Sequence, residues 1–136
     1  MKKIVSACLA GIECRYDCKS QERVDIVEMV KNGDAIPLCP EQLGGLSTPR
    51  TPAEIQGERV IAKDGKDVTE NYMRGAEEAL KMTQLVNADE ALLKSKSPMC
   101  GCGKIYDGSY SGNLIDGDGV FTKLLKKNGI KVTSVD

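Results

Sequence analysis

Histidine and tryptophan are absent from the 136-residue sequence, and phenylalanine occurs once. Without histidine the chain cannot build a Ser-His-Asp or Cys-His catalytic pair, an HExxH zinc site, a two-histidine iron site or a histidine-ligated haem. Whole reaction classes are therefore excluded. Any catalysis must depend on thiolates, carboxylates, hydroxyls, lysine, arginine or a cofactor that thiolates hold.

Long hydrophobic runs and an excess of one charge are missing as well. No apolar stretch approaches the ~18 residues of a membrane span, which excludes a membrane-spanning chain. The 19 lysines and arginines nearly balance 20 aspartates and glutamates, so the net charge of -1 argues against a nucleic-acid partner. This length suits one domain, residues 1–136, with a single core. The first apolar stretch is too short for a secretory signal, so we expect a cytoplasmic protein.

Cysteine, by contrast, is abundant, with six residues. An even number would allow disulfides, but in a reducing cytosol metal binding or catalysis is the better interpretation. Thiolates without histidine favour a soft metal, and the candidates are zinc, copper(I) or an iron-sulfur cluster. The alternative is that some cysteines are small apolar core residues.

Short apolar runs bounded by turn residues predict buried strands. The runs are residues 3–8, 34–39, 90–94 and 130–133. Pro37 favours a sheet edge for the second run, because proline donates no backbone hydrogen bond.

Apolar residues at helical spacing lie between these strands, in residues 24–30, 72–80 and 120–125. Gly33 and Gly129 end the first and the third helix, and Asp67 with Glu70 resembles a capping box for the second. Strands that alternate with helices predict an α/β fold. We expect a Rossmann-like open sheet, mostly parallel, with helices on both faces.

An inserted β-hairpin is predicted from Gly57 to Val68. Residues 59–62 and 66–68 flank Asp64-Gly65, which is a strong two-residue turn signal. No internal repeat or linker divides the rest of the sequence.

Three cysteines follow predicted strands. Cys8 and Cys39 end the first two strands, and Cys100 lies in the loop after the third. The carboxyl ends of parallel strands form the usual ligand crevice, so these thiols should converge there. Cys102 is an alternative to Cys100 as the third ligand.

Two further cysteines, Cys14 and Cys18, lie in a polar turn. A Cys-x3-Cys pair can bind zinc, form a redox disulfide or carry sulfur. Solvated loop cysteines without a shared role are an equally good interpretation.

Several spaced blocks form a recognisable pattern: Ser6-Ala7-Cys8-Leu9-Ala10-Gly11, Arg15-Tyr16-Asp17, Cys39-Pro40-Glu41, Gly44-Gly45-Leu46, Pro49-Arg50-Thr51-Pro52-Ala53-Glu54, Leu93-Lys94-Ser95-Lys96-Ser97-Pro98-Met99-Cys100-Gly101 and Ile105-Tyr106-Asp107-Gly108. In this order they resemble the bacterial thiouracil desulfidases of the TudS type. The resemblance covers essentially the whole chain. The chain departs from that pattern at Met99, where the family usually has a small residue, and at Cys14, Cys18 and Cys102, which are not general family cysteines.

The resemblance implies a 4Fe-4S cluster held by Cys8, Cys39 and Cys100, with one iron left free of protein. That iron would bind the sulfur of a thiolated pyrimidine, and water would replace the sulfur without any electron donor. Glu41 and Ser97 fall on the acidic and hydroxyl positions associated with catalysis. Glu41 is the nearest candidate general base, a role that histidine cannot fill in this chain. A cluster with an open iron is oxygen-sensitive and can be lost during purification in air.

Two residues are candidates for substrate contact. Arg50 lies in a proline-rich loop, and its guanidinium can hydrogen-bond a planar carbonyl edge. Tyr106 can stack on a pyrimidine or pack in the core.

We expect a small-molecule thiolated substrate and a monomer or homodimer. The alternative function is a non-catalytic metal, cluster or sulfur-handling module, in which Cys102 could close the cluster as a fourth ligand.

Overall fold

The central element of the molecule is a four-stranded sheet in the order β2-β1-β5-β8. The structure, a computed structural model, describes residues 2–136. The strands are β1 (Lys3–Ser6), β2 (Ala35–Leu38), β5 (Glu90–Lys94) and β8 (Lys131–Val135). All three pairs are parallel, as expected, and Pro37 lies in the edge strand β2.

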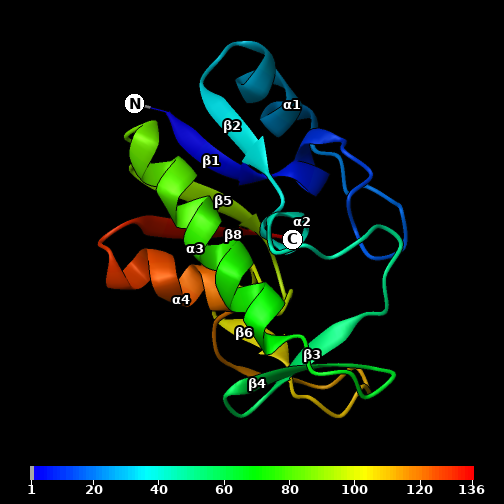
Figure 1. Cartoon of the computed structure of the whole chain (residues 1–136). Helices are drawn as coiled ribbons and strands as arrows, with labels where there is room; N and C mark the ends of the chain where they lie inside the picture. Colours follow the sequence, from blue (N-terminus) through cyan, green and yellow to red (C-terminus); the bar gives the residue numbers. More distant parts are fainter. Residues whose placement is uncertain (1) are drawn as a thin grey trace.

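Helices cover both faces of this sheet (Figure 1). Helices α3 (Thr69–Leu85) and α4 (Val120–Lys127) pack on one face, and α1 (Val24–Lys31) packs on the other. The predicted α/β architecture is therefore confirmed. No helix in residues 2–136 is both long enough and apolar enough to cross a bilayer.

Alternating strand residues build two apolar layers. Ile4 and Leu93 point into the layer under α3 and α4, where Phe121 is completely buried. Val5 points into the other layer, against Ile26 of α1. The central strands β1 and β5 contribute to both layers, so they appear in the sequence as short continuous apolar runs.

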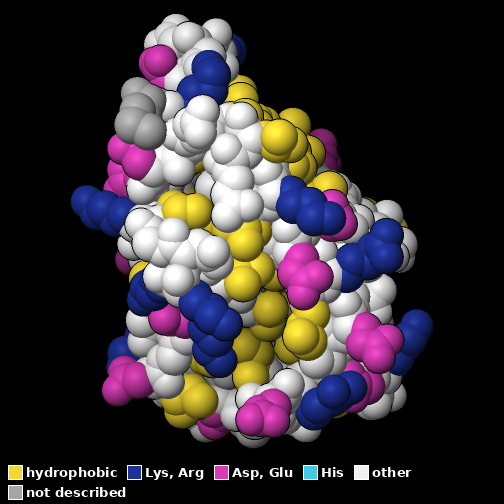
Figure 2. Space-filling model, turned by 60° about the vertical axis from the view of Figure 1, so that its left-hand side comes forward, with side chains coloured by type: hydrophobic (Ala, Val, Ile, Leu, Met, Phe, Trp, Pro, Cys, Tyr) yellow, Lys and Arg dark blue, Asp and Glu magenta, His cyan; other side chains and the backbone are white. Residues whose placement is uncertain are grey.

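A shallow groove between α3 and α4 exposes part of the first layer. It is lined by Met73, Ala76, Glu77, Val120, Lys123, Leu124 and Lys127. Figure 2 shows apolar side chains gathered between charged ones on this side of the molecule.

The predicted inserted hairpin is present, and it has a further strand. Strand β4 (Arg59–Ala62) pairs along its whole length with the preceding strand β3 (Ala53–Gln56). The predicted pairing with residues 66–68 is shorter: Ala62 donates its backbone N–H to Lys66, Val68 donates to Val60, and Ile61 forms an isolated bridge with Asp67. The turn at Gly57 adopts a left-handed conformation, which glycine allows at no steric cost. The hairpin therefore begins at Ala53.

The predicted capping box is wrong. Oδ1 of Asp67 accepts the backbone N–H of Thr69 at 2.9 Å, and its Oδ2 binds Arg59. The N-cap of α3 is Val68, without a side-chain cap, and Glu70 is exposed. This Asx turn leads residues 66–68 into the start of the helix, so their pairing with β4 stays short.

Three short elements were not predicted. A 3-10 turn, η1 (Ala7–Ala10), follows β1, so Cys8 lies just beyond the strand and not in it. Helix α2 (Pro40–Leu43) follows β2 directly. A second hairpin consists of β6 (Lys104–Tyr106) and β7 (Leu114–Asp116).

Candidate active site

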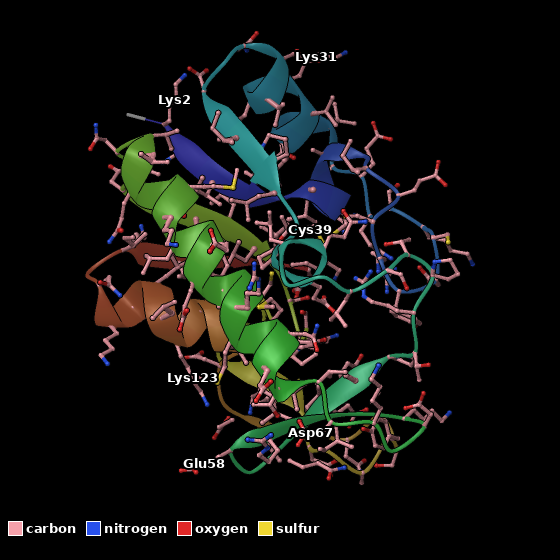
Figure 3. The ribbon with its side chains drawn as sticks, in the orientation of Figure 1. Lys2, Lys31, Cys39, Glu58, Asp67 and Lys123 are labelled. Atoms are coloured by element: carbon pink, nitrogen blue, oxygen red, sulfur yellow. The ribbon has the colours of Figure 1, made fainter. Side chains whose placement is uncertain are left out.

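A cavity of about 480 Å³ lies at the carboxyl ends of the parallel strands. Its walls come from η1, the segment 14–16, α2, both hairpins and the turn after β5. Every predicted site residue lines it: Cys8, Cys39, Glu41, Arg50, Ser97, Cys100 and Tyr106. Figure 3 shows Cys39 near the centre of the molecule, whereas Lys31, Glu58 and Lys123 lie at its periphery.

The three predicted ligand thiols come from three separate elements. Cys8 lies in η1, Cys39 is the N-cap residue of α2, and Cys100 ends the turn that follows β5. Cys8 and Cys100 are buried, and burial raises the pKa of both thiols. Buried thiols of this kind remain protonated unless a positive charge or a metal stabilises the thiolate.

Close packing fixes the turn that carries Cys100. A Cβ on Gly119, at the start of α4, would lie 2.5 Å from the carbonyl of Met99 and 2.8 Å from the nitrogen of Cys100. Ser97 Oγ accepts the backbone N–H groups of Met99 and Cys100 at 3.0 Å each. The serine therefore shapes the turn that presents the thiol, in addition to lining the cavity.

The three predicted ligand thiols influence one another. Besides burial, the nearby Cys8 and Cys39 raise the pKa of Cys100, because negative charges so close together disfavour one another. Within residues 2–136, no three Cys, Asp or Glu side chains form a group that could hold a single metal ion. Three thiols that line one cavity, without histidine, have the donor chemistry of an iron-sulfur cluster site.

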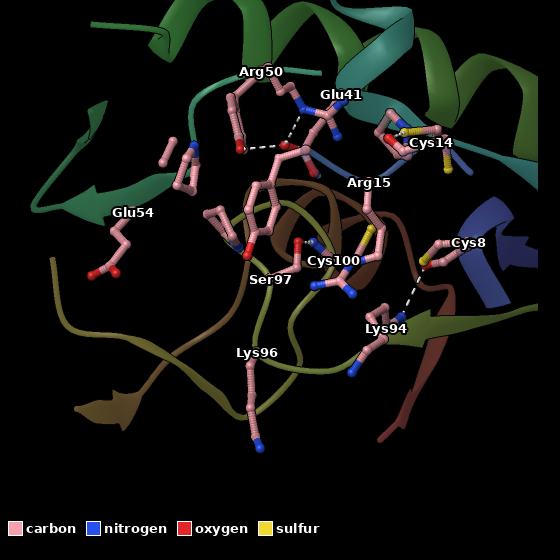
Figure 4. A pocket seen from close by; sticks show the side chains of 18 of the residues that line it. Cys8, Cys14, Arg15, Glu41, Arg50, Glu54, Lys94, Lys96, Ser97 and Cys100 are labelled. Carbon is pink, nitrogen blue, oxygen red and sulfur yellow. Dashed lines mark hydrogen bonds and ion pairs between the residues drawn. The ribbon is translucent and has the colours of Figure 1, made fainter. Parts of the chain in front are cut away.

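Glu41 lies on α2, two residues after Cys39. Tyr72 on α3 donates its hydroxyl hydrogen to Oε1 of Glu41 at 2.6 Å, and Arg50 donates from Nε to the same oxygen at 3.4 Å. Figure 4 shows Glu41 and Arg50 together on one wall, with Cys8 and Lys94 on the opposite wall. No donor among residues 2–136 contacts Oε2 of Glu41.

The guanidinium of Arg50 is held firmly by its loop. Nη1 donates to the carbonyl of Ser47 at 3.1 Å and to Oγ1 of Thr48 at 2.9 Å, and the side chain is 8% exposed. No acceptor in the described chain contacts Nη2. The arginine thus combines a fixed position with one nitrogen that is free to donate.

Residues 4–136 match the family of 2-thiouracil desulfurases. The chain belongs to this family. The uncharacterized protein YbbK of Bacillus subtilis (strain 168) is 44% identical over 141 residues, which covers 96% of this chain and 93% of that protein. A solved structure of the [4Fe-4S]-dependent thiouracil desulfidase TudS is 46% identical, with a TM-score of 0.93, covering 98% of this chain and 89% of the other.

In this 2-thiouracil desulfurase family member, Cys14 is a further cavity residue that sequence reasoning left unplaced. It is buried, and its carbonyl oxygen lies 3.9 Å from Sγ of Cys39. A hydrogen bond from the side-chain thiol of Cys14 lowers the pKa of Cys39 to about 7, although burial opposes this shift. Cys18 and Cys102 do not line the cavity, so the structure brings Cys100 rather than Cys102 to the other thiols.

Tyr72 is the second residue of the family member's site that sequence reasoning missed. The helical spacing of apolar residues indicated only a core position for it, because the pattern does not reveal what its hydroxyl contacts. Pairing of that hydroxyl with Glu41 depends on how α2 docks on α3, which is a long-range contact.

Cationic side chains predominate over acidic ones around the cavity. Arg15, Arg50, Lys63, Lys94 and Lys96 line it, together with Glu41 and Glu54. Burial lowers the pKa of Lys94, whereas Lys96 is exposed and points away from the thiols (Figure 4). Tyr106 of β6 lies half-buried on the hairpin wall.

Proposed function

We propose that this chain is an iron-sulfur-dependent desulfidase that converts a thiolated pyrimidine such as thiouracil, with water, into the oxo pyrimidine and sulfide. The observation that carries the proposal is that three thiols, each following a different strand of the parallel sheet, line one cavity. Membership of the 2-thiouracil desulfurase family and likeness to a [4Fe-4S]-dependent thiouracil desulfidase support it. We further propose that residues 1–136 form one domain and that the enzyme acts in the cytoplasm.

Cys8, Cys39 and Cys100 would hold the cluster as thiolates. When bound, a 4Fe-4S cluster with three protein ligands supplies one Lewis-acidic iron that can bind and polarise the substrate's sulfur. Cys102 lies outside the cavity, so the proposal leaves that iron without a fourth cysteine.

Glu41 would act as the general base. Its Oε1 is held by Tyr72 and Arg50, and its Oε2 remains available to accept a proton from water. The water oxygen forms a bond to the ring carbon and the carbon-sulfur bond breaks. Glu41 passes the proton that it accepted to the departing sulfide, which also receives the second water proton and leaves as hydrogen sulfide. No electrons are gained or lost in this sequence.

Arg50 and Tyr106 would bind the substrate. The free Nη2 of Arg50 can donate to a ring carbonyl, and the ring of Tyr106 offers a face for stacking. Ser97 would hold Cys100 in place through its two accepted hydrogen bonds and orient the water with its hydroxyl.

A non-catalytic cluster or sulfur-handling module is the second candidate, and the buried thiol of Cys14 beside Cys39 favours it. A store that used all the thiols would need them together, yet Cys18 is exposed and outside the cavity. Replacing Cys14 and Cys18 by serine separates the two functions. A desulfidase keeps its cluster and its turnover, whereas a thiol store loses metal or sulfur capacity.

The test of the proposal is anaerobic reconstitution followed by chemical analysis. We expect about four irons and four sulfides per chain, and conversion of thiouracil to uracil with release of one sulfide. Glu41→Gln should bind the same iron and lose at least about 100-fold in kcat. A fully loaded protein that converts no thiolated pyrimidine, or one that binds stoichiometric zinc instead, would contradict the proposal.

A further inference from the structure

Tyr72 is a buried tyrosine whose hydroxyl reaches a polar cavity. It lies on α3 with 1% of its surface exposed, and it also lines the cavity. Its ring packs in the apolar layer with Ile4 and Leu93. The ring therefore belongs to the core, while the hydroxyl belongs to the site.

Two facing glycines bring Tyr72 within reach of α2. A Cβ on Gly44 would lie 2.0 Å from the carbonyl oxygen of Asn71, and a Cβ on Gly75 would lie 1.9 Å from that of Pro40. Asn71 also donates from Nδ2 to the carbonyl of Gly44 at 2.9 Å. The backbones of α2 and α3 are thus in direct contact, which sets the position of Glu41 relative to the tyrosine hydroxyl.

The resulting hydrogen bond is short and directed at one carboxylate oxygen. The Tyr72 hydroxyl lies 2.6 Å from Oε1 of Glu41, closer than the 3.4 Å of the Arg50 contact. A neutral hydroxyl that donates to a carboxylate forms a stronger bond than one between two neutral groups. Burial raises the pKa of Tyr72 well above its ordinary value, so the hydroxyl keeps the hydrogen that it donates.

We propose that Tyr72 is a positioning residue for the reaction. Its hydroxyl holds Oε1 of Glu41 by a hydrogen bond, so that Oε2 faces the water that attacks the substrate. The inference rests on the proposed function, in which Glu41 is the base. A carboxylate held at one oxygen cannot rotate freely about its last side-chain bond. The base is then oriented before substrate arrives, which reduces the entropy lost in the reaction.

A purely structural tyrosine would satisfy its buried hydroxyl with any nearby acceptor. Its removal would lower stability and cluster content, and the effect on rate would not depend on Glu41. A positioning tyrosine changes kcat through Glu41 alone. The two roles therefore give different results in a double-mutant cycle.

Tyr72→Phe removes only the hydroxyl and keeps the ring. In the reconstituted enzyme we expect kcat to fall about 10- to 100-fold, a part of what a general base contributes. KM should stay within about two-fold, and iron and sulfide per chain should not change. Tyr110→Phe is the matched control, because this tyrosine lines the same cavity and its hydroxyl donates to the carbonyl of Ile61. Its kcat should stay within about two-fold of wild type.

The decisive comparison adds Tyr72→Phe to Glu41→Gln. The proposal expects no further loss of kcat, because the only group that Tyr72 positions is already disabled. An equal loss in both backgrounds, a change confined to KM, or an equal loss in Tyr110→Phe would overturn it. If wild type turns over thiouracil and Tyr72→Phe does so equally well, only this inference fails. If the loaded wild type turns over no thiolated pyrimidine, the proposed function fails, and the inference fails with it.

Glu41→Asp provides a second variant in case Tyr72→Phe does not fold. It keeps the carboxylate but withdraws it from the tyrosine hydroxyl by one methylene. We expect kcat to fall by at least about 10-fold although a base is still present. A rate near that of wild type would show that the position of the carboxylate does not matter and would overturn the proposal.

Discussion

The two ends of the parallel sheet carry opposite kinds of chemistry. At the amino end, Glu90 of β5 accepts hydrogen bonds from Lys3 of β1 at 2.6 Å and from Thr133 of β8 at 2.7 Å, and Lys131 lies 3.6 Å away. At the carboxyl end, Cys8, Cys39 and Cys100 face a cavity. Strands β1 and β5 thus begin in an ion-pair network and end next to thiols that face the cavity.

This difference separates stability from function within one sheet. The paired carboxylate of Glu90 at the amino end stabilises the register of three strands. Both of its oxygens already accept hydrogen bonds, so it is not available to bind a ligand. A buried thiol at the carboxyl end gains a partner only when something enters the cavity. Changes at the amino end should therefore alter stability alone, and changes at the carboxyl end should alter cluster content or turnover.

The largest expected effect follows replacement of a thiol that faces the cavity. Cys39→Ala should reduce iron to well below four per chain after reconstitution, with at least about 100-fold loss of turnover, because the proposed cluster keeps too few ligands. Cys102→Ala is the matched control, and its iron content and rate should equal those of wild type. Loss of iron in Cys102→Ala, together with full iron in Cys100→Ala, would contradict the assignment of cluster binding to the thiols that face the cavity.

An intermediate effect is expected on the hairpin wall of the cavity. Oε1 of Glu54 in β3 accepts the backbone N–H groups of Gly108 at 2.9 Å and Tyr110 at 3.1 Å. Glu54→Ala should release the loop after β6, lower the free energy of unfolding by about 1–2 kcal/mol and raise KM several-fold. Iron content should not change, and Glu58→Ala in the exposed turn of the same hairpin should match wild type. Loss of iron in Glu54→Ala would show that this wall is part of the cluster site.

The smallest effect is expected at the amino end of the sheet. The hydrogen bond from Lys3 lowers the pKa of Glu90 from 4.5 to about 2. A carboxyl with a lowered folded-state pKa stabilises the protein above its unfolded pKa, and this stability is lost as pH falls toward the folded value. Above pH ~5 the free energy of unfolding of wild type should exceed that of Glu90→Gln by no more than about 1 kcal/mol. This difference in stability should disappear near pH ~2. Denaturant unfolding across this range measures it.

The control for this experiment is Glu28→Gln, an exposed change on α1. Its stability difference from wild type should stay near zero at every pH, and both variants should turn over substrate as wild type does. A change in kcat in Glu90→Gln would contradict the division of the sheet into a stabilising and a functional end.

The sheet could be predicted from the sequence because its signals are local. Strand β5 has the predicted bounds, and Gly33 and Gly129 adopt left-handed conformations just after α1 and α4. Only part of the hairpin could be predicted. The signal at Asp64-Gly65 correctly indicates a turn and the short pairing around it. The main partner of β4 is Ala53–Gln56, which carries no strong strand pattern.

The cavity could be predicted in outline for the same reason. Once parallel strands were expected, Cys8 and Cys39 had to lie at one edge of the sheet. The contacts of Tyr72 and Cys14 could not be predicted, because each depends on contacts between segments about 25 to 31 positions apart. Packing of α2 on α3 through facing glycines leaves no pattern that a single sequence makes visible.

Helix α2 has a consequence for how the proposed base and the proposed ligand move. Cys39 is its N-cap residue and Glu41 lies in its first turn, with Pro40 between them, so one short rigid unit carries both groups. A shift of this unit against the sheet moves the thiolate and the carboxylate in the same direction. Thermal motion of the ligand therefore changes the distance between metal and base less than it would if the two groups came from different segments.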